Sequence, residues 1–275
     1  MTGSAWIVQN LRAVRGRAYP RVLGAQREPS WIFFDVALPL LTVAAYIYMY
    51  KFMDAPKEFV GFVILGGAMT AFWLNILWSM ASQFYWEKET GNLSLFLIAP
   101  VSRMSILGGM AVGGLFFTTL RASATLVIGI VVFGVTLSLS SPLMLIAIFL
   151  VTMVSLYGMG MMFASLYLLF GREAYNMSNL MTEPIYLASG FYFPVKALGY
   201  WAAAGASIIP ITLGLDGLRQ LFYPESSAQY GFLPVGTELV ILVGLSVLFL
   251  ILSKVSLDYM ENLGKTTGRL TLRWQ

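Results

Sequence analysis

Residues 86–103 read WEKETGNLSLFLIAPVSR, and this stretch decides the fold of the chain. It is a charged island between two hydrophobic segments that are too long for a soluble domain. Glu87 and Glu89 lie two positions apart and are followed by Gly91, a residue type that favours turns. We therefore expect residues 86–103 to form a cytosolic loop that joins two membrane-spanning helices.

The second half of this loop is apolar and ends at Pro100. Its apolar residues are Leu93, Leu95, Phe96, Leu97 and Ile98. Because proline cannot continue a helix, this pattern predicts a short amphipathic helix that ends before Pro100. Apolar side chains on such a loop are typical of a surface that binds another protein. They could equally insert into lipid, and the residues alone leave the two interpretations equally open.

The composition of the whole chain predicts an all-α membrane protein. Of its 275 residues, 58% are hydrophobic and only 11% are charged, whereas an ordinary soluble domain carries about 25% charged residues. Polar residues are therefore too few to cover a soluble fold of this length. We find no internal repeat and no low-complexity linker, so residues 1–275 are predicted to form one membrane domain.

The residue types also exclude several kinds of site. The chain contains no Cys and no His, which excludes disulfides, thiolate nucleophiles, histidine acid–base catalysis and zinc sites with the usual ligands. We expect no catalytic residues, no metal and no cofactor in this chain. The formal net charge is +4, but the basic residues are scattered rather than gathered with aromatic residues, so no nucleic-acid partner is expected.

Six segments are long and apolar enough to cross a bilayer as helices. They are Trp31–Met53, Phe59–Phe84, Met104–Leu137, Pro142–Phe170, Asn176–Phe193 and Phe232–Leu252. The fifth is the weakest, because Glu183 interrupts it. A further apolar stretch, residues 200–222, contains Asp216 and Arg219. We expect it to form a re-entrant or interfacial hairpin within an outer region, residues 194–231, that precedes the last span.

The distribution of basic residues supports this topology. With six crossings and a cytosolic N-terminus, the basic residues outside are Lys51, Lys57, Lys196 and Arg219. Those inside are Arg12, Arg15, Arg17, Arg21, Arg27, Lys88, Arg103, Arg172, Lys254, Lys265, Arg269 and Arg273. Cytosolic segments carry an excess of Lys and Arg. We therefore expect a multi-pass protein of the cell (inner) membrane with both termini in the cytosol and no cleavable signal sequence.

Residues 1–30 precede the first span and are rich in arginine. The residues that share one helical face there are Ile7, Leu11, Val14 and Ala18. Their spacing predicts an amphipathic helix that lies on the inner membrane surface and is broken from Pro20 onward. A solvated basic tail is the alternative interpretation.

Two ionisable residues lie midway along predicted spans, Arg121 in the third and Glu183 in the fifth. An arginine at the centre of a membrane helix costs at least about 2.5 to 3.5 kcal/mol, so it should contact protein, water or an acidic partner. Glu183 is the nearest candidate partner by depth, and a pair between them is our first interpretation. The alternative is that one of the two lines a translocation path.

Three motifs follow one another along the chain. They are Glu87-x-Glu89-x-Gly91 with Pro100-Val-Ser-Arg103 nine positions later, then Ala188-Ser-Gly-Phe-Tyr-Phe-Pro194, and then Pro210 with Asp216-Gly-Leu-Arg219. Their order and spacing resemble those of the type-2 ATP-binding-cassette (ABC) exporter permeases, and the resemblance covers most of the chain. The chain departs from that family at Asn92 and Ser94, where many members have threonine and glutamate.

The resemblance implies a role for residues 86–103, because in this family the loop carries a coupling helix that rests on a separate ATPase subunit. It thereby favours protein docking over insertion into lipid. The implied contact residues are Glu87, Glu89, Gly91, Leu93, Phe96, Pro100 and Arg103. ATP and magnesium would bind the ATPase subunit, and Gly264-Lys265-Thr266 is no phosphate-binding loop because Tyr259 stands where that motif needs glycine.

The resemblance also implies the biological role. Two permease subunits, identical or different, would pair around a path, and two ATPase subunits below would drive export. The spans offer many aromatic and methionine side chains but few fixed charges, which favours an amphipathic drug-like or lipid substrate. Polysaccharide or glycolipid export and a secondary transporter remain as alternatives.

Overall fold

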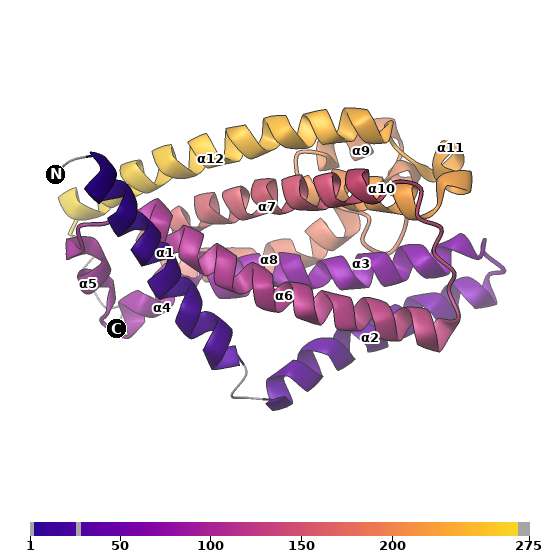
Figure 1. Cartoon of the computed structure of the whole chain (residues 1–275), viewed down its shortest axis with the longest axis horizontal. Helices are drawn as coiled ribbons and strands as arrows, with labels where there is room; N and C mark the ends of the chain where they lie inside the picture. Colours follow the sequence, from indigo (N-terminus) through magenta and orange to yellow (C-terminus); the bar gives the residue numbers. More distant parts are fainter. Residues whose placement is uncertain (1–2, 26–28, 269–275) are drawn as a thin grey trace.

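The computed structural model describes residues 3–25 and 29–268, and every regular element in those ranges is a helix (Figure 1). Arg27, Arg269 and Arg273, which the sequence places on the inner side, lie outside the described residues. The α-helices are α1 (Gly3–Ala25), α2 (Pro29–Phe52), α3 (Glu58–Leu74), α4 (Gln83–Glu89), α5 (Leu93–Ile98), α6 (Arg103–Phe133), α7 (Pro142–Phe170), α8 (Arg172–Ala188), α9 (Tyr200–Ala206), α10 (Pro210–Phe222), α11 (Ser227–Tyr230) and α12 (Val235–Thr266). A π-helix (Asn75–Ala81) joins α3 to α4, and short 3-10 helices cover Val195–Leu198 and Pro224–Ser226. The predicted all-α fold is confirmed.

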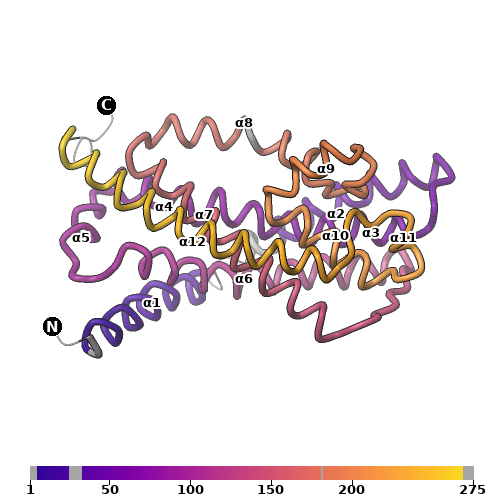
Figure 2. Tube along the Cα trace, turned by 90° about the horizontal axis from the view of Figure 1, so that it is seen from above, coloured from indigo at the N-terminus to yellow at the C-terminus, as the bar shows by residue number. Residues whose placement is uncertain are grey.

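The long helices lie roughly along one axis and form an elongated bundle (Figure 1). Helices α4 and α5 and the C-terminal part of α12 share one end, which we call the α5 end, and α1 lies obliquely across the bundle near it. Helices α9 and α11 lie at the opposite end, the α9 end. Helices α1 and α8 cover opposite faces of the bundle (Figure 2).

Five stretches of helix are long and apolar enough to cross a membrane. They are Phe33–Phe52, Glu58–Glu89, Arg103–Phe133, Pro142–Phe170 and Val235–Thr266. They correspond to five of the six predicted spans. The second is mostly buried by its neighbours, whereas the first, third and last are mostly exposed. This arrangement is expected where one central helix is surrounded by other helices and the bundle is surrounded by lipid, because apolar side chains that face lipid need no protein cover.

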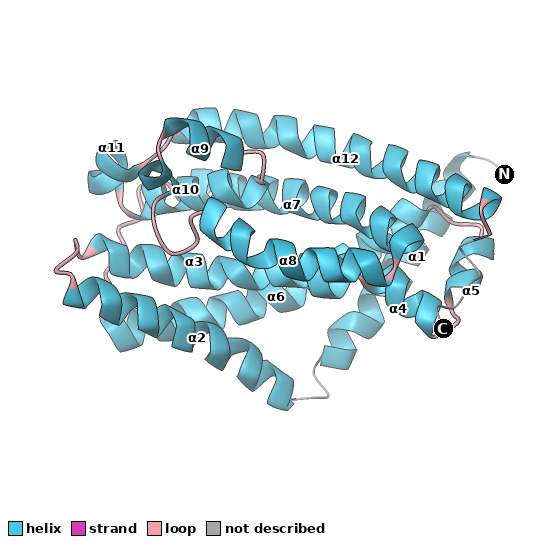
Figure 3. Cartoon of the chain, turned by 180° about the vertical axis from the view of Figure 1, so that it is seen from behind, coloured by secondary structure: helices cyan, strands magenta, loops and turns pink. Residues whose placement is uncertain are grey.

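The predicted fifth span differs from its expected form. Helix α8 ends at Ala188 rather than continuing to Phe193, because Gly190 takes a left-handed backbone conformation with φ of +63° that stops a helix. With 17 residues and three charged side chains, α8 falls short of the length and apolarity of the five spans above. It nevertheless runs from the α5 end to α9, parallel to the other long helices (Figure 3).

The stretch predicted to be a hairpin is a bent helix pair. Helices α9 and α10 meet at 114°, a geometry that fits either a broken span or a re-entrant loop. Helix α10 packs against α3, α7 and α12, and residues 210–221 are buried. Arg219, which the sequence analysis assigned to the outer region, is buried within the protein, at 3% exposure.

Helix α1 corrects one prediction about the N-terminal segment. It continues through Pro20 to Ala25 instead of breaking there. Proline removes one backbone hydrogen bond, but contacts on both sides of this position hold the helix. The backbone of Ala18 lies against Gly113 of α6, and Arg21 donates a 2.6 Å hydrogen bond to the carbonyl of Ser79.

Candidate functional site

The loop expected at residues 86–103 is largely helical. Helix α4 extends to Glu89, so the first four residues of the expected loop continue the second span, and α5 covers Leu93–Ile98 as predicted. The turn between the two helices contains Gly91, whose φ of +81° is a left-handed conformation that residues with a Cβ rarely adopt. The sequence therefore placed the turn correctly but began the loop too early.

Glu87 is buried in contacts within the chain. Its carboxylate forms an ion pair with Arg17 of α1 and accepts a 2.6 Å hydrogen bond from the Gln83 side chain. The guanidinium of Arg17 also lies 4.8 Å from the centre of the Phe96 ring. Glu87 and Phe96, predicted as contacts to a partner, therefore attach α4 and α5 to α1.

Arg103 joins the same loop to the last helix. Its guanidinium donates 2.8 Å to the carboxylate of Glu261 in α12 and 2.9 Å to the carbonyl of Leu97. Lys265, one turn further along α12, donates 2.6 Å to the same Glu261 carboxylate. Arg103 thus fixes the end of α5 against α12, a role that the sequence did not indicate.

Asn10 is a further residue that the sequence analysis missed. Its side-chain oxygen accepts 2.8 Å hydrogen bonds from the backbone of Ser102 and from the hydroxyl of Ser105, where α6 begins. Asn10, Arg17 and Arg21 are spaced by seven and four residues and so share one face of α1. That polar face meets the bundle, whereas Ile7 and Leu11, at the start of the predicted apolar face, are mostly exposed.

Helix α1 approaches α6 closely because α6 presents glycines there. A Cβ added at Gly109 would lie 2.6 Å from the carbonyl oxygen of Val14, and one at Gly113 would lie 3.0 Å from that of Ala18. Ile7 and Leu11 of the predicted apolar face are instead more than half exposed, at 54% and 62%. They are free to contact lipid.

The exposed part of the loop contains apolar side chains beside the polar residues Thr90, Asn92 and Ser94. Leu95 is 61% exposed and Ile98 is 77% exposed, whereas the predicted contact residue Leu93 is buried. Gly91 and Pro100 are also exposed, and Glu89 is half-buried. We call Gly91, Leu95, Ile98 and Pro100 the docking face. It lies at the α5 end of the bundle (Figure 1).

The predicted pair between Arg121 and Glu183 is wrong. Arg121 forms an ion pair with Asp35 of α2, and its guanidinium lies 4.9 Å from the centre of the Phe117 ring. Helix α6 packs against α1, α2 and α3, whereas α8 packs against α7 and α9. Arg121 and Glu183 both lie midway along their predicted spans, but α6 and α8 are not neighbours, so the two residues do not meet.

Glu183 lies instead on an exposed part of α8, at the edge of a cavity of about 280 Å³ between α2, α3 and α8. The cavity also has three tyrosines in its wall, Tyr46, Tyr186 and Tyr192. Among the residues that the structure describes, no ion pair involves Glu183. Its place in the molecule leaves its carboxylate open to a group from outside the chain.

A polar cluster fills the interior around α10. Arg219 donates hydrogen bonds of 2.8 to 3.0 Å to the carbonyls of Phe62, Gly190, Phe191 and Phe193. Asp216 accepts 2.8 Å hydrogen bonds from Gln220 and from the backbone of Phe232. The Asp216-Gly-Leu-Arg219 motif therefore fixes α10 to the segment after α8 and to the start of the last span.

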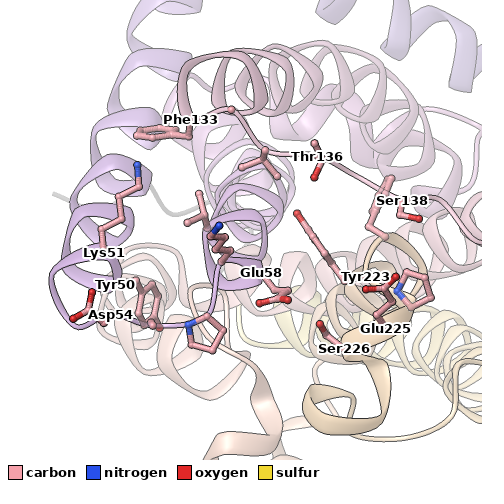
Figure 4. Close-up of a pocket in the computed structure, with 18 residues that line it drawn as sticks. Tyr50, Lys51, Asp54, Glu58, Phe133, Thr136, Ser138, Tyr223, Glu225 and Ser226 are labelled. Carbon is pink, nitrogen blue, oxygen red and sulfur yellow. The ribbon is translucent and has the colours of Figure 1, made fainter.

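A larger cavity of about 680 Å³ opens at the α9 end (Figure 4). It lies between the end of α2, the start of α3 and the segments that follow α6 and α10. Its charged residues are Lys51, Asp54, Lys57, Glu58 and Glu225. Because the two signs are mixed, this cavity has no clear preference for a cation or an anion.

The described residues contain no group of three or more Asp and Glu side chains placed to hold a metal ion. The docking face can bind an apolar surface, and the ion pairs of Arg17 and Arg103 connect that face to α1 and α12.

Comparison with known proteins identifies the family. The profile of the ABC-2 type transporter family matches residues 21–223. The probable multidrug ABC transporter permease YbhR of Escherichia coli K12 is 30% identical over 145 residues, and YbhR of Escherichia coli O157:H7 matches equally. The match covers 51% of this chain but only 38% of YbhR. No solved structure matches this chain significantly. Because the family match extends from α1 to the end of α10, this multi-pass membrane protein belongs to the ABC-2 type transporter family.

Proposed function

We propose that this chain is the permease subunit of an ATP-driven ABC exporter and that the docking face binds its ATPase subunit. The observation that carries the proposal is the exposure of Leu95 and Ile98 on a loop that is otherwise fastened to the bundle. Apolar side chains held rigidly at the end of a membrane bundle are expected where another protein binds.

The contacts around the docking face supply a route for coupling. Movement of α5 would be transmitted to α1 through the contact of Phe96 with Arg17, which also pairs with Glu87 of α4. It would reach α12 through Arg103, which joins the carbonyl of Leu97 to Glu261. Helix α6 follows directly, because Arg103 is its first residue. One surface patch is thereby joined to three helices, as a protein driven from outside the membrane requires.

The proposed substrate is amphipathic, either drug-like or lipid. Two features support it: the spans are rich in aromatic and methionine side chains, and the related YbhR proteins are described as probable multidrug permeases. ATP and magnesium would bind the ATPase subunit. A second permease subunit would complete the path, and transport would proceed outward from the cytosol.

The first test is capture of the cognate ABC ATPase by the purified chain after co-expression. Replacing both Leu95 and Ile98 with serine should reduce capture by at least tenfold, because the two side chains are the most exposed apolar groups of the docking face. A matched control is Trp201→Ser, which removes an 85% exposed apolar side chain at the opposite end of the bundle. Capture equal to that of the unmodified chain would contradict the proposal.

A further inference from the structure

Glu183 is an ionisable residue that forms no ion pair with any residue in the described ranges 3–25 and 29–268. Arg121, the basic residue expected to pair with it, pairs with Asp35 instead. Lys196, a basic residue that follows α8 in the chain, donates a 3.3 Å hydrogen bond to the carbonyl of Ala228 and forms no ion pair with Glu183. Helix α8 lies beside the membrane-spanning helices, and a carboxylate at membrane depth is costly unless a cation or water reaches it.

Two of the tyrosines beside Glu183 are held in place by contact with each other, and Tyr186 packs edge-on against Phe191. The rings of Tyr46 and Tyr192 stack with their centres 4.2 Å apart and their planes 12° from parallel. The hydroxyl of Tyr50 donates a 3.1 Å hydrogen bond to the carbonyl of Tyr192, which fixes that residue further. Aromatic rings attract ammonium groups electrostatically, so the rings and the carboxylate favour the same kind of ligand.

The size and surroundings of the cavity limit what it can hold. A volume of about 280 Å³ is close to the lower end of the range for small-molecule sites, roughly 300 Å³. It therefore has room for a head group rather than for a whole drug or lipid. Leu38, in the wall of the cavity, is 59% exposed and extends the apolar surface toward lipid.

We propose that this cavity binds the cationic head group of an amphipathic substrate, with Glu183 as counter-ion and the tyrosine rings around the charge. This inference rests on the proposed transport function and narrows its substrate class to lipophilic cations. The larger cavity at the α9 end lacks such a preference, because Lys51 and Lys57 share it with three carboxylates.

The test is equilibrium binding of benzyltrimethylammonium, a cation of head-group size, to the purified full-length chain without ATP or ATPase. Glu183→Gln should weaken binding of this cation by at least tenfold, because it removes the counter-ion and keeps the shape of the side chain. Binding of neopentylbenzene, the uncharged carbon analogue of the same shape, should not weaken. Glu183→Asp, which keeps the charge, should retain most of the affinity for the cation.

The matched control is Glu225→Gln, which removes a carboxylate from the larger cavity and should leave the affinity unchanged. Equal affinity of the Glu183→Gln variant and the unmodified chain would overturn the proposal, and so would equal losses for Glu183→Gln and Glu225→Gln. Thermal unfolding of each variant shows whether a loss reflects misfolding. Because the assay omits the ATPase, its failure is distinct from failure of the docking experiment.

Discussion

At the scale of single residues, the pairing of Arg121 shows how a charge is accommodated within an apolar helix. Its partner Asp35 and the ring of Phe117 replace part of the water that the guanidinium loses. The side chains of Arg121 and Asp35 remain 19% and 35% exposed, so solvent screens part of their attraction. The pair therefore makes the charge tolerable rather than adding much to stability.

Asp35→Asn and Arg121→Leu should each destabilise the purified protein by about 1 to 2 kcal/mol, because each leaves one charge without its partner. Changing both should cost less than the sum of the single changes, with a coupling energy of about 1 kcal/mol. Thermal or denaturant unfolding in detergent measures all three. Arg121→Leu combined with Glu183→Gln is the control and should be additive, and additivity of the Asp35 cycle would refute the pairing.

Gly91 is a second residue with a testable role. Its φ of +81° makes a side chain unfavourable whatever the space around it. Gly91→Ala should impose a strain of about 1 to 2 kcal/mol and shift α5 relative to α4, since a left-handed conformation is costly for any other L-residue. We expect weaker capture of the ATPase with little change in the unfolding temperature of the whole bundle. Undiminished capture would show that the turn tolerates a side chain.

At the scale of elements, the contact between α1 and α6 can be tested at two neighbouring glycines of α6, Gly109 and Gly108. An added methyl group at Gly109 would meet the backbone of α1, whereas at Gly108 it would meet nothing within 4 Å. Gly109→Ala should destabilise the protein by about 1 to 3 kcal/mol through overpacking. Gly108→Ala should be neutral or stabilise by up to about 1 kcal/mol, because alanine favours helix.

Unfolding in detergent measures the stability of the Gly108→Ala and Gly109→Ala variants, and limited proteolysis measures how firmly α1 is held against the bundle. Faster cleavage within residues 3–25 is expected for Gly109→Ala alone. If both variants behave alike, the close contact between the two helices is not a source of stability.

Elements could be predicted from the sequence where a single physical pattern dominates. Five spans are continuous apolar segments of membrane length, and four of them are found within five residues of their predicted bounds. The last, predicted to end at Leu252, continues to Thr266. Helix α8 was harder because polar residues and Glu183 interrupt its apolar ones, and its end depended on the conformation of Gly190. The extension of α1 through Pro20 depended on contacts with α6 that no local pattern contains.

Site residues could likewise be predicted where they depend on local sequence and not where they depend on contacts between distant helices. The turn at Gly91 and the apolar run of α5 are local features and were predicted. The partners of Glu87, Arg103 and Arg121 lie 70, 158 and 86 positions away along the chain. Such contacts depend on which helices are neighbours, and helix composition alone carries little information about neighbours. The deep burial of Arg219 was missed for this reason too.

At the scale of the whole molecule, the two ends of the bundle differ in their basic residues. Within the described residues, the α5 end includes Lys88, Arg103 and Lys265, while Lys51, Lys57 and Lys196 lie at the α9 end. This distribution, with the arginines of α1 near the α5 end, agrees with a cytosolic α5 end under the positive-inside rule. The docking face would then point into the cytosol, where an ATPase could reach it.

Labelling of single cysteines in intact cells tests this orientation, and the chain offers a clean background because it contains no cysteine. Ser94→Cys places an exposed thiol on α5, and Ala228→Cys places one on α11 at the α9 end. A thiol reagent that cannot cross membranes should label Ala228→Cys in intact cells and Ser94→Cys only after the membrane is opened. Ser165→Cys is the control for access, because Ser165 is completely buried and should resist labelling in both conditions. The reverse pattern would place the docking face outside the cell, where an ATPase subunit could not reach it. Labelling of both Ser94→Cys and Ala228→Cys in intact cells would place both positions outside and would contradict the predicted topology of six crossings.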